Sequence, residues 1–499
     1  MKVSIRRYKM IHHLEGFIPF WDDKLTDHRE TTAVLSVNKP AKVESILQFD
    51  KPWEGNGINY FSMVHDDGKY RLYYESWSDF DPEWQEGINV CYAESSDGIH
   101  WEKPNLGVCE FRGSKDNNIL MAQIPDNITV MLDKNPKCPP EQKYKAVMTV
   151  TDTTGFDGAP AEPIHHALGC LVSADGIHFS KFCLISVGYQ YDSQNTLHWD
   201  EHTGKYYCYF RAFHPGTSEP DSTFQEESIR DIMVTESEDL LHWSEPEALQ
   251  YGASEDYPLY TNCIMAYPYD TRYYIGWPTR YVERKDWTPN FDRLTGREKR
   301  KHRIETAEKR MGLTTTDCVF MSSRDRYHWH RFDEACITPG PENGRNWVYG
   351  DCYPVYNGLL ETPGRFPGTP NELSIFVDEN MWMGIPKELI RYVYRMDGFA
   401  SYKAGYRWEK LITVPFTFTG DTLSVNFRTS ARGSLYAEIL DIRNNPIPGY
   451  KTCEIFGDSV NRILDFEKPL SALSGQTVRL RFTMRDAEIF AMRFSSDTK

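Results

Sequence analysis

One seven-residue pattern recurs along the chain and constrains its fold more than any other feature of the sequence. Each complete copy reads Ser-x-Asp-x-x-His followed by an aromatic residue, and copies lie at 95–101, 173–179, 237–243 and 323–329. A shortened copy lies at 397–399. The five aspartates, spaced 78, 64, 86 and 72 residues apart, are Asp97, Asp175, Asp239, Asp325 and Asp397. A repeat of this length indicates an array of similar structural units.

Each copy lies between two short apolar runs, as a tight turn between antiparallel strands does. A second hairpin pattern precedes every copy. These upstream hairpins pair 58–64 with 69–75, 127–132 with 144–150, 196–199 with 205–211, 260–267 with 272–277, and 351–356 with 372–377. One copy alone would be a chance hairpin sequence. Five repeats of four strands predict an all-β chain whose main domain is a five-bladed β-propeller.

Beyond the repeats the pattern changes to short alternating strands, which predict a C-terminal β-sandwich. These strands are expected at 412–418, 422–428, 434–440, 477–484 and 489–494. The predicted domains are an N-terminal segment, 1–46, that wraps the outside of the propeller, the propeller itself, 47–407, and the sandwich, 408–499. An insertion at 290–311 is basic and compatible with a helix. We interpret it as a solvated face, with phosphate or partner recognition, including a homo-oligomer contact, as the alternative.

Charge limits the classes of partner. The chain has 56 Lys and Arg against 72 Asp and Glu, a net charge of −16, which repels nucleic acid and anionic lipid. Residues 1–16 lack the apolar segment of a secretion signal, and the eleven cysteines form no CxxC pair, so we expect a cytoplasmic protein with reduced thiols. No cofactor or metal motif is present, although a structural calcium or sodium ion in the propeller channel is left open.

The start of each inner strand carries a short polar side chain at an equivalent position of the repeat. These five residues are Asn59, Asn127, Asn195, Asn262 and Asp351. In a propeller such positions surround the central axis, where amides can both donate to and accept from the hydroxyls of a ligand. The alternative is that each asparagine only begins its strand in a local turn.

Carboxylates cluster near the same positions, and glycoside hydrolysis needs two of them. The candidates are Glu54, Asp126, Asp192, Asp256 and Asp351, of which Glu54, Asp192 and Asp351 are predicted to be catalytic. Aromatic and cationic residues nearby could stack on a sugar ring or hold an anionic group. These predicted substrate-binding residues are Trp53, Arg211, Tyr260, Arg280 and Trp347, with Asn59, Asp126, Asn127, Asn195 and Asn262 from the sets above. The histidine of each repeat is assigned to packing.

With this repeat and a trailing sandwich, the chain resembles the five-bladed glycoside hydrolases of families 32 and 68 and their relatives in families 43, 62, 117 and 130. The segments that carry the resemblance are 53–57, 192–195, 260–262 and 346–351. The resemblance implies a base or nucleophile in blade I, a supporting aspartate in blade II and an acid in blade III. The matching positions hold Glu54, Asp126 and Asp192.

The local surroundings suggest different roles. Asp192 is flanked by Ser, Gln and Asn, which favour an ionised base or nucleophile, whereas Glu54 and Asp351 follow aromatic residues that favour a protonated acid. The leading hypothesis is an exo-acting glycoside hydrolase that takes a terminal, furanoside-like sugar of a carbohydrate substrate. The alternatives are a phosphate-dependent phosphorylase or transferase, a sialidase, and a non-catalytic glycan-binding propeller.

Overall fold

The structure is a computed structural model that describes residues 11–78, 84, 87–159, 164, 166–215, 228–306, 308–382 and 386–496. The chain forms two units. One comprises 40–362 and 373–393, and the other comprises 1–39, 363–372 and 394–499.

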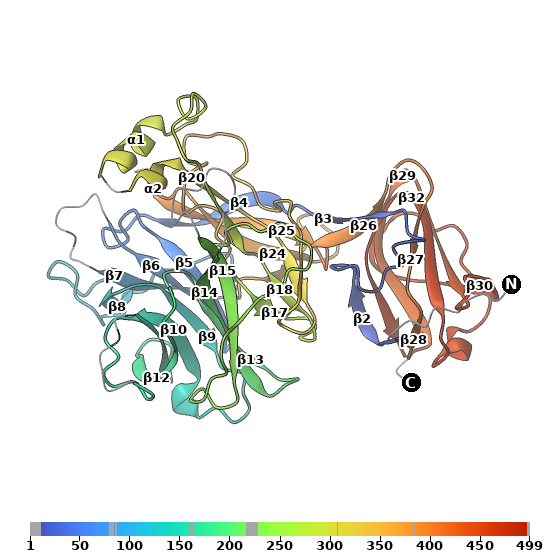
Figure 1. Cartoon of the computed structure of the whole chain (residues 1–499), viewed down its shortest axis with the longest axis horizontal. Helices are drawn as coiled ribbons and strands as arrows, with labels where there is room; N and C mark the ends of the chain where they lie inside the picture. Colours follow the sequence, from blue (N-terminus) through green and yellow to red (C-terminus); the bar gives the residue numbers. More distant parts are fainter. Residues whose placement is uncertain are drawn as a thin grey trace. The chain divides into compact units, whose positions relative to one another are not determined.

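The first unit is a five-bladed β-propeller, which confirms the prediction (Figure 1). Blades I to III are four-stranded antiparallel sheets whose strands follow one another in chain order. Blade I contains β5 (Asn59–Asp66), β6 (Lys69–Ser76), β7 (Ile88–Ser95) and β8 (Ile119–Ile124). Blade II contains β9 (Ile128–Leu132), β10 (Tyr144–Val150), β11 (Ala167–Ser173) and β12 (Ser180–Val187). Blade III contains β13 (Thr196–Asp200), β14 (Lys205–Pro215), β15 (Ser228–Ser237) and β16 (Glu247–Ala248).

Blade IV is extended by a second strand pair that leads to the insertion. Its four-stranded sheet contains β17 (Met265–Ala266), β18 (Tyr274–Gly276), β21 (Met321–Ser323) and β22 (Trp329–Arg331). In the sequence, β19 (Thr279–Glu283) follows β18, and its partner β20 (Thr314–Cys318) precedes β21. The helices α1 (Arg297–Thr306) and α2 (Lys309–Leu313) lie between β19 and β20. The expected helix is confirmed. The solvated-face interpretation is wrong for Arg300 and Arg303, which are buried.

Blade V is closed by the N-terminal part of the chain. Its strand order is β23 (Leu360–Thr362), β24 (Glu372–Glu379), β25 (Lys387–Arg395) and then β4 (Ala41–Phe49). The expected inner strand at 351–356 makes only two isolated bridges, Pro354 with Val377 and Tyr356 with Ser62. The expectation that residues 1–46 wrap the outside of the propeller is therefore corrected. Residues 41–49 form the outer strand of blade V and pair with β25, whose edge would otherwise be unpaired.

The repeated pattern is a hydrogen-bonded turn after the third strand of a blade. The Ser95 hydroxyl oxygen accepts from the backbone N–H groups of Asp97 and Gly98, at 3.2 and 2.9 Å. The Asp97 carboxylate accepts from the N–H groups of Ile99 and His100, both at 2.8 Å. The same bonds recur in the turns that contain Asp175, Asp239 and Asp325. The pattern is therefore a structural element of the blades, as predicted.

We expect Gly176→Ala, in the second of these turns, to lower the free energy of unfolding by about 2–3 kcal/mol. Gly176 has φ +76°, and an added Cβ would lie 2.6 Å from the Tyr73 hydroxyl and 3.0 Å from the Tyr144 ring. Gly204→Ala is the matched control, because Gly204 has φ +67° with no atom within 4 Å of the added Cβ. Urea unfolding should show a loss of only about 1 kcal/mol for the control. Equal losses would contradict the contact.

The second unit is an all-β body built on two long strands, β29 (Thr422–Leu440) and β32 (Arg479–Ser495). Their pairing breaks register between Thr429 and Ser434. The other strands are β1 (His12–Leu14), β2 (Gly16–Pro19), β3 (Val34–Val37), β26 (Ala400–Ala404), β27 (Glu409–Ile412), β28 (Phe416–Phe418), β30 (Pro446–Lys451) and β31 (Asp458–Ile463). Among the described residues, the remaining helical segments are the short turns Pro140–Gln142 and Leu470–Leu473.

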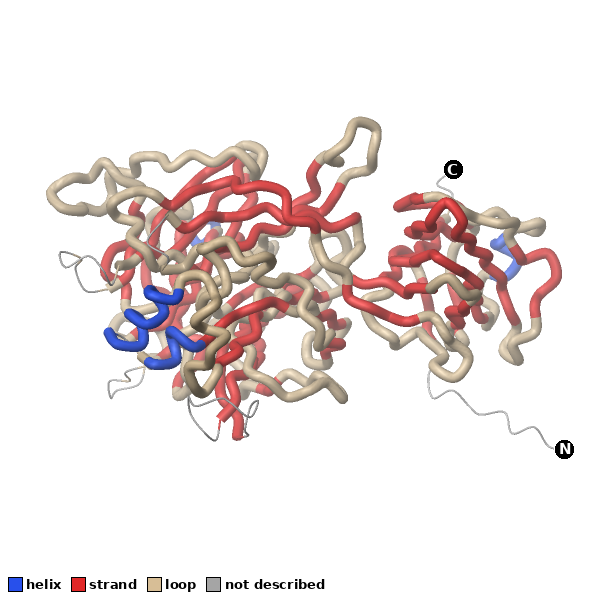
Figure 2. Tube along the Cα trace, turned by 90° about the horizontal axis from the view of Figure 1, so that it is seen from above, coloured by secondary structure: helices blue, strands red, loops and turns tan. Residues whose placement is uncertain are grey.

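Strands dominate both units (Figure 2), and α1 is the longest helix among the described residues. The shortened repeat at 397–399 connects β25 to β26, which pairs with β32 and so belongs to the second unit. All eleven cysteines are free thiols, and most are buried. No described helix is long and apolar enough to cross a membrane.

Candidate active site

Three carboxyl groups from three consecutive blades influence one another in the propeller. Glu75 lies near the end of β6, Asp126 lies two residues before β9, and Asp192 lies four residues before β13. Burial, followed by repulsion from Asp126 and Asp192, raises the pKa of Glu75. Burial and repulsion from Asp192 raise the pKa of Asp126. This group of three, rather than the trio expected from the sequence, is the candidate site.

Glu75 is fully buried, and this burial raises its pKa well above the ordinary value. One of its oxygens accepts from the backbone N–H of Ile128 at 2.6 Å. The other has no hydrogen-bond partner among the described residues. Asn59 is paired directly opposite Glu75 in the β5–β6 register, which places this predicted residue beside the site.

Asp126 and Asp192 differ in their exposure and in their neighbours. Asp126 is half-buried, and its pKa is raised to about 7. Its Oδ1 atom accepts from the N–H of Asn127 at 2.9 Å. The Asp192 side chain is 57% exposed, and one of its oxygens lies 3.6 Å from a guanidinium nitrogen of the buried Arg211. The Asp126 carboxyl is thus close to half-protonated at neutral pH, whereas Asp192 is exposed beside the Arg211 guanidinium.

The predicted amide ring holds the backbone in place around these carboxylates. Asn127 and Asn195 both donate to the Tyr191 carbonyl oxygen, at 2.7 and 2.8 Å, and so fix the residue before Asp192. Asn262 donates to the Gln194 carbonyl at 2.9 Å and accepts from Thr196 at 3.0 Å. All three asparagines are buried. Since their hydrogen-bonding groups are engaged with the protein, the structure favours the turn-forming alternative over direct ligand binding.

A cluster of tyrosines borders Asp192. The hydroxyls of Tyr60 and Tyr349 each bond to that of Tyr260, at 3.0 and 2.9 Å. Burial, followed by the negative charge of Asp192, raises the pKa of Tyr260 to about 12. The guanidinium of Arg230 lies 4.2 Å from the Tyr281 ring centre. These tyrosines are buried, so they form a hydrogen-bonded aromatic cluster next to the exposed Asp192 carboxylate.

The structure places Glu54 in a buried ion pair away from this group. Its oxygens accept from the Tyr74 hydroxyl at 2.7 Å, and from the Lys51 N–H and the Lys103 ammonium, both at 2.8 Å. Because Tyr74 and Glu75 are neighbours on one strand, their side chains point to opposite faces of the sheet. Trp53 packs in the same core and donates to Asn118 at 2.5 Å. We therefore leave both Glu54 and Trp53 out of the candidate site.

We expect Lys103→Met to lower the free energy of unfolding by about 3–5 kcal/mol, because it leaves Glu54 buried without its cation. Thermal and urea unfolding would measure this loss. Lys51→Met is the matched control, since the Lys51 side chain is 45% exposed and its ammonium lies 3.7 Å from the exposed Asp50. Its effect should stay within about 0.5 kcal/mol. Losses of similar size in the two variants would contradict the structural role given to Lys103.

Asp351 also lies outside the group of three. It is buried in blade V, where one oxygen accepts from the Met381 N–H at 2.9 Å. Burial raises its pKa well above the ordinary value, and its charged neighbours are Lys387, Asp378 and Glu379. The raised pKa of Asp351 is in the direction expected of an acid, but its position does not join it to Asp192.

The remaining candidates lie elsewhere. Arg280 and Trp347 line a separate cavity of about 410 Å³, in which Arg280 forms a two-pronged ion pair with Asp317 at 2.7 Å. Asp256 is exposed and lies 3.1 Å from His214. Of the predicted residues, the structure thus brings together Asn59, Asp126, Asp192, Arg211 and Tyr260, with Asn127, Asn195 and Asn262 as their support. Glu75 was not predicted, although it is the one carboxylate of strand β6 and follows the apolar and aromatic run 72–74, which was its signal.

Comparison with known proteins gives no family assignment: neither a family model nor a curated protein matches the sequence. Solved structures with a similar fold include an N-acetylgalactosamine deacetylase from F. plautii, at 12% identity and a TM-score of 0.39 over 95% of both chains. They also include a Bombyx mori GH32 β-fructofuranosidase, at 12% identity and a TM-score of 0.38 over 91% of this chain and 95% of that one. A Coprinopsis cinerea GH62 α-L-arabinofuranosidase has 10% identity and a TM-score of 0.37 over 73% and 98%. These values are too low to transfer a residue role or a substrate.

Proposed function

We propose that this protein is an exo-acting glycoside hydrolase whose catalytic pair is Asp126 and Asp192. The observation that carries the proposal is the contrast between the two neighbouring carboxyls. Asp126 has a pKa of about 7, and Asp192 is exposed next to Arg211. A carboxyl that can donate a proton and a second carboxyl near it are what glycoside hydrolysis needs.

In this mechanism the Asp126 proton moves to the glycosidic oxygen as the bond to the sugar breaks. The Asp192 carboxylate stabilises the positive charge that develops on the ring, and either attacks the anomeric carbon or removes a proton from the attacking water. Glu75 does not contact the substrate in this scheme, because its side chain has no exposed surface. It acts as a positioning residue through its bond to the Ile128 N–H, next to Asp126. The reaction uses only these carboxyls and requires no cofactor.

A terminal, furanoside-like sugar is the substrate we propose. Asp192 is exposed, whereas the tyrosines around it are buried to within a few per cent of their surface. A single exposed carboxylate bordered by buried tyrosines suits one small ring better than the interior of a long chain. Hydrolysis of a panel of aryl α- and β-furanosides and pyranosides tests this choice. Release of terminal sugars from furanosides supports it, and preferential cleavage of pyranosides or of internal bonds contradicts it.

A phosphate-dependent reaction is the second candidate, because two buried arginines lie near the site. Arg211 and Arg230 both hold their guanidinium groups within 6 Å of the Tyr260 ring centre, at 5.8 and 5.9 Å. Such groups can bind phosphate. Sugar release in phosphate-free buffer would support hydrolysis, and release only after phosphate is added would support phosphorolysis. Binding of oligosaccharides without any turnover would instead indicate a glycan-binding propeller.

A further inference from the structure

The sheet of the second unit carries aromatic and cationic side chains on the face away from its core. Lys410 of β27 and Tyr436 of β29 both lie opposite Thr483 of β32 in the register of these strands. Trp408, which directly precedes β27, and Arg485 of β32 lie two residues from members of this row, so they point to the same face. The ring centres of Trp408 and Tyr436 are 5.9 Å apart, so the two rows form one surface.

Two of the rings on this surface have a cation beside them. The Arg485 guanidinium lies 4.7 Å from the Trp408 ring centre, and the ammonium of Lys451, in β30, lies 5.8 Å from the Tyr436 ring centre. Distances below about 6 Å are typical of cation–π contacts. The surface thus alternates aromatic and cationic groups across neighbouring strands.

A third pair of an aromatic ring and a cation extends the surface beyond the strands. The Arg432 guanidinium lies 5.6 Å from the ring centre of Tyr406, which lies in the turn between β26 and β27. The carbonyl oxygen of Gly405 accepts from the Asp486 N–H at 2.6 Å, which holds this turn next to β32. We call the whole set the aromatic face, and its members are Tyr406, Trp408, Tyr436, Arg432, Lys451 and Arg485.

The aromatic face is open to solvent. With their cations in place, Tyr406 is 70% exposed and Trp408 is 47% exposed. The other four members are exposed or half-buried. Isolated exposed rings are common on protein surfaces, whereas a contiguous group of them marks an interaction site. A ligand would therefore reach both the rings and the cations.

The three cations of the aromatic face have no carboxylate partner among the described residues. Three carboxylates of the surrounding segments are each held by another side chain. They are Glu438, Glu454 and Asp486, held by Arg481, Ser434 and Ser430. The positive charge of the aromatic face is therefore available to a ligand.

Charge is divided unevenly between the two units. The second unit carries 23 Lys and Arg against 18 Asp and Glu, a net charge of +5, whereas the propeller carries 33 against 54, a net charge of −21. An anionic ligand is therefore attracted to the second unit and repelled by the propeller.

Acidic sugars fit this combination of groups. Aromatic rings stack on the apolar face of a sugar ring, and arginine and lysine form charge-assisted hydrogen bonds to carboxylates. Nucleic acid, which also offers flat rings and negative charge, carries a charge at every phosphate and is commonly bound by about six to ten cationic contacts. The aromatic face offers three, on a chain whose net charge is −16. A polymer whose charges are separated by neutral rings is therefore favoured.

We propose that the aromatic face is a non-catalytic binding site for a polysaccharide in which carboxylate-bearing sugars are separated by neutral ones. The sugar rings would stack on Trp408 and its neighbouring tyrosines, and the carboxylates would bond to Arg432, Lys451 and Arg485. This inference is independent of the proposed reaction, because it uses none of the residues of the candidate active site.

Titration calorimetry of the full chain with matched polysaccharides tests the proposal. Hyaluronan, unsulfated chondroitin and glucuronoxylan carry the separated carboxylates, and the carboxyl-reduced form of each is its neutral counterpart. We expect at least one acidic polymer to bind about tenfold or more tightly than its counterpart, the factor that follows from one charge-assisted hydrogen bond. Failure of all three to bind, equal affinities within every pair, or tighter binding of poly(U) than of all three would overturn the proposal.

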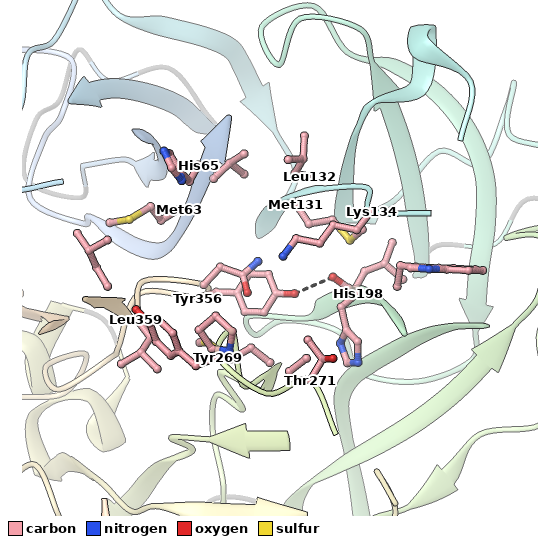
Figure 3. A pocket seen from close by; sticks show the side chains of 18 of the residues that line it. Met63, His65, Met131, Leu132, Lys134, His198, Tyr269, Thr271, Tyr356 and Leu359 are labelled. Atoms are coloured by element: carbon pink, nitrogen blue, oxygen red, sulfur yellow. Dashed lines mark hydrogen bonds between the residues drawn. The ribbon is translucent and has the colours of Figure 1, made fainter. Parts of the chain in front are cut away.

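Variants locate the bound polymer. Trp408→Ala and Lys451→Met should each weaken binding at least fivefold, and both side chains are exposed enough to be replaced without loss of the fold. Tyr269→Ala is the matched control for the ring, because Tyr269 is 43% exposed but lines a cavity of about 560 Å³ in the propeller (Figure 3). Lys137→Met, at an exposed lysine of the propeller, is the control for the cation.

Both controls should bind as the wild type does, and so should Asp192→Asn, in which the proposed reaction is blocked. Unchanged binding in Trp408→Ala and Lys451→Met would overturn the inference. Loss of binding in Tyr269→Ala or in Asp192→Asn would also overturn it, because the polymer would then lie in the propeller.

Discussion

Asp192→Asn is expected to lower kcat/KM for the best furanoside substrate by about 10³-fold or more. The amide can neither attack the anomeric carbon nor accept a proton from water, and a positioned base or nucleophile contributes rate factors of this order. The fold should be retained, because the Asp192 side chain is 57% exposed and its contact with Arg211, at 3.6 Å, is its one recorded ion pair among the described residues. Steady-state kinetics on the purified variant measures the effect.

Asp256→Asn is the matched control for this prediction. Asp256 is also an exposed aspartate that precedes an inner strand of the propeller, and it pairs with His214 at 3.1 Å. Its activity should stay close to that of the wild type. Added azide separates the possible roles of Asp192, since rescue of Asp192→Asn by azide supports an attacking or water-activating group. Full activity in Asp192→Asn, or equal losses in Asp192→Asn and Asp256→Asn, would refute the site.

The fold could be predicted because its signal is local and repeated. Each turn of the Asp97 type is fixed by hydrogen bonds within five residues, so the sequence pattern and the structure coincide. The closure of blade V could not be predicted in the same way. The strand β4 pairs with β25, which lies more than 330 residues away in the sequence, and no local pattern marks such a pairing.

The site was predictable only in part, for a related reason. Asp192 and Asp126 were found because each precedes an inner strand and lies close to one of the predicted asparagines, Asn195 and Asn127. Glu54 satisfied the same local criteria, but a lysine distant in sequence, Lys103, pairs with it in the core. Whether a carboxylate faces the axis or a buried cation depends on contacts between segments that are distant in the sequence, and these are absent from the local sequence.

Asp126→Asn is expected to affect substrates according to their leaving groups. Hydrolysis of substrates with poor leaving groups, such as alkyl glycosides, should fall about 10²–10⁴-fold, because the departing oxygen then needs a proton. Dinitrophenyl glycosides, whose leaving group departs as a stable anion, should lose little activity. Wild-type activity should decline above pH 7 as Asp126 loses its proton, and this decline should vanish in the variant. Equal losses on both classes of substrate would contradict the role of Asp126 as the acid.

The same substitution should stabilise the protein at neutral and alkaline pH. The pKa of Asp126 rises from 3.8, its ordinary value, to about 7 in the folded protein. Between these values the unfolded chain releases a proton that the native protein retains, so native stability falls as pH rises through this window. A shift of this size corresponds to at most about 4 kcal/mol, and the partial exposure of Asp126 reduces the expected gain to about 1–2 kcal/mol at pH 8.

Urea unfolding of wild type and Asp126→Asn at pH 4, 6 and 8 measures this dependence. The two proteins should differ little at pH 4, where the Asp126 carboxyl is mostly protonated in the native state and half-protonated in the unfolded chain. The advantage of the variant should then grow with pH and level off above pH 7. Asparagine can keep the bond from the Asn127 N–H, since that bond is accepted by a single oxygen. A variant less stable than the wild type at pH 8 would show that the Asp126 charge is stabilised in the fold, and the carboxyl could then not serve as a proton donor at neutral pH.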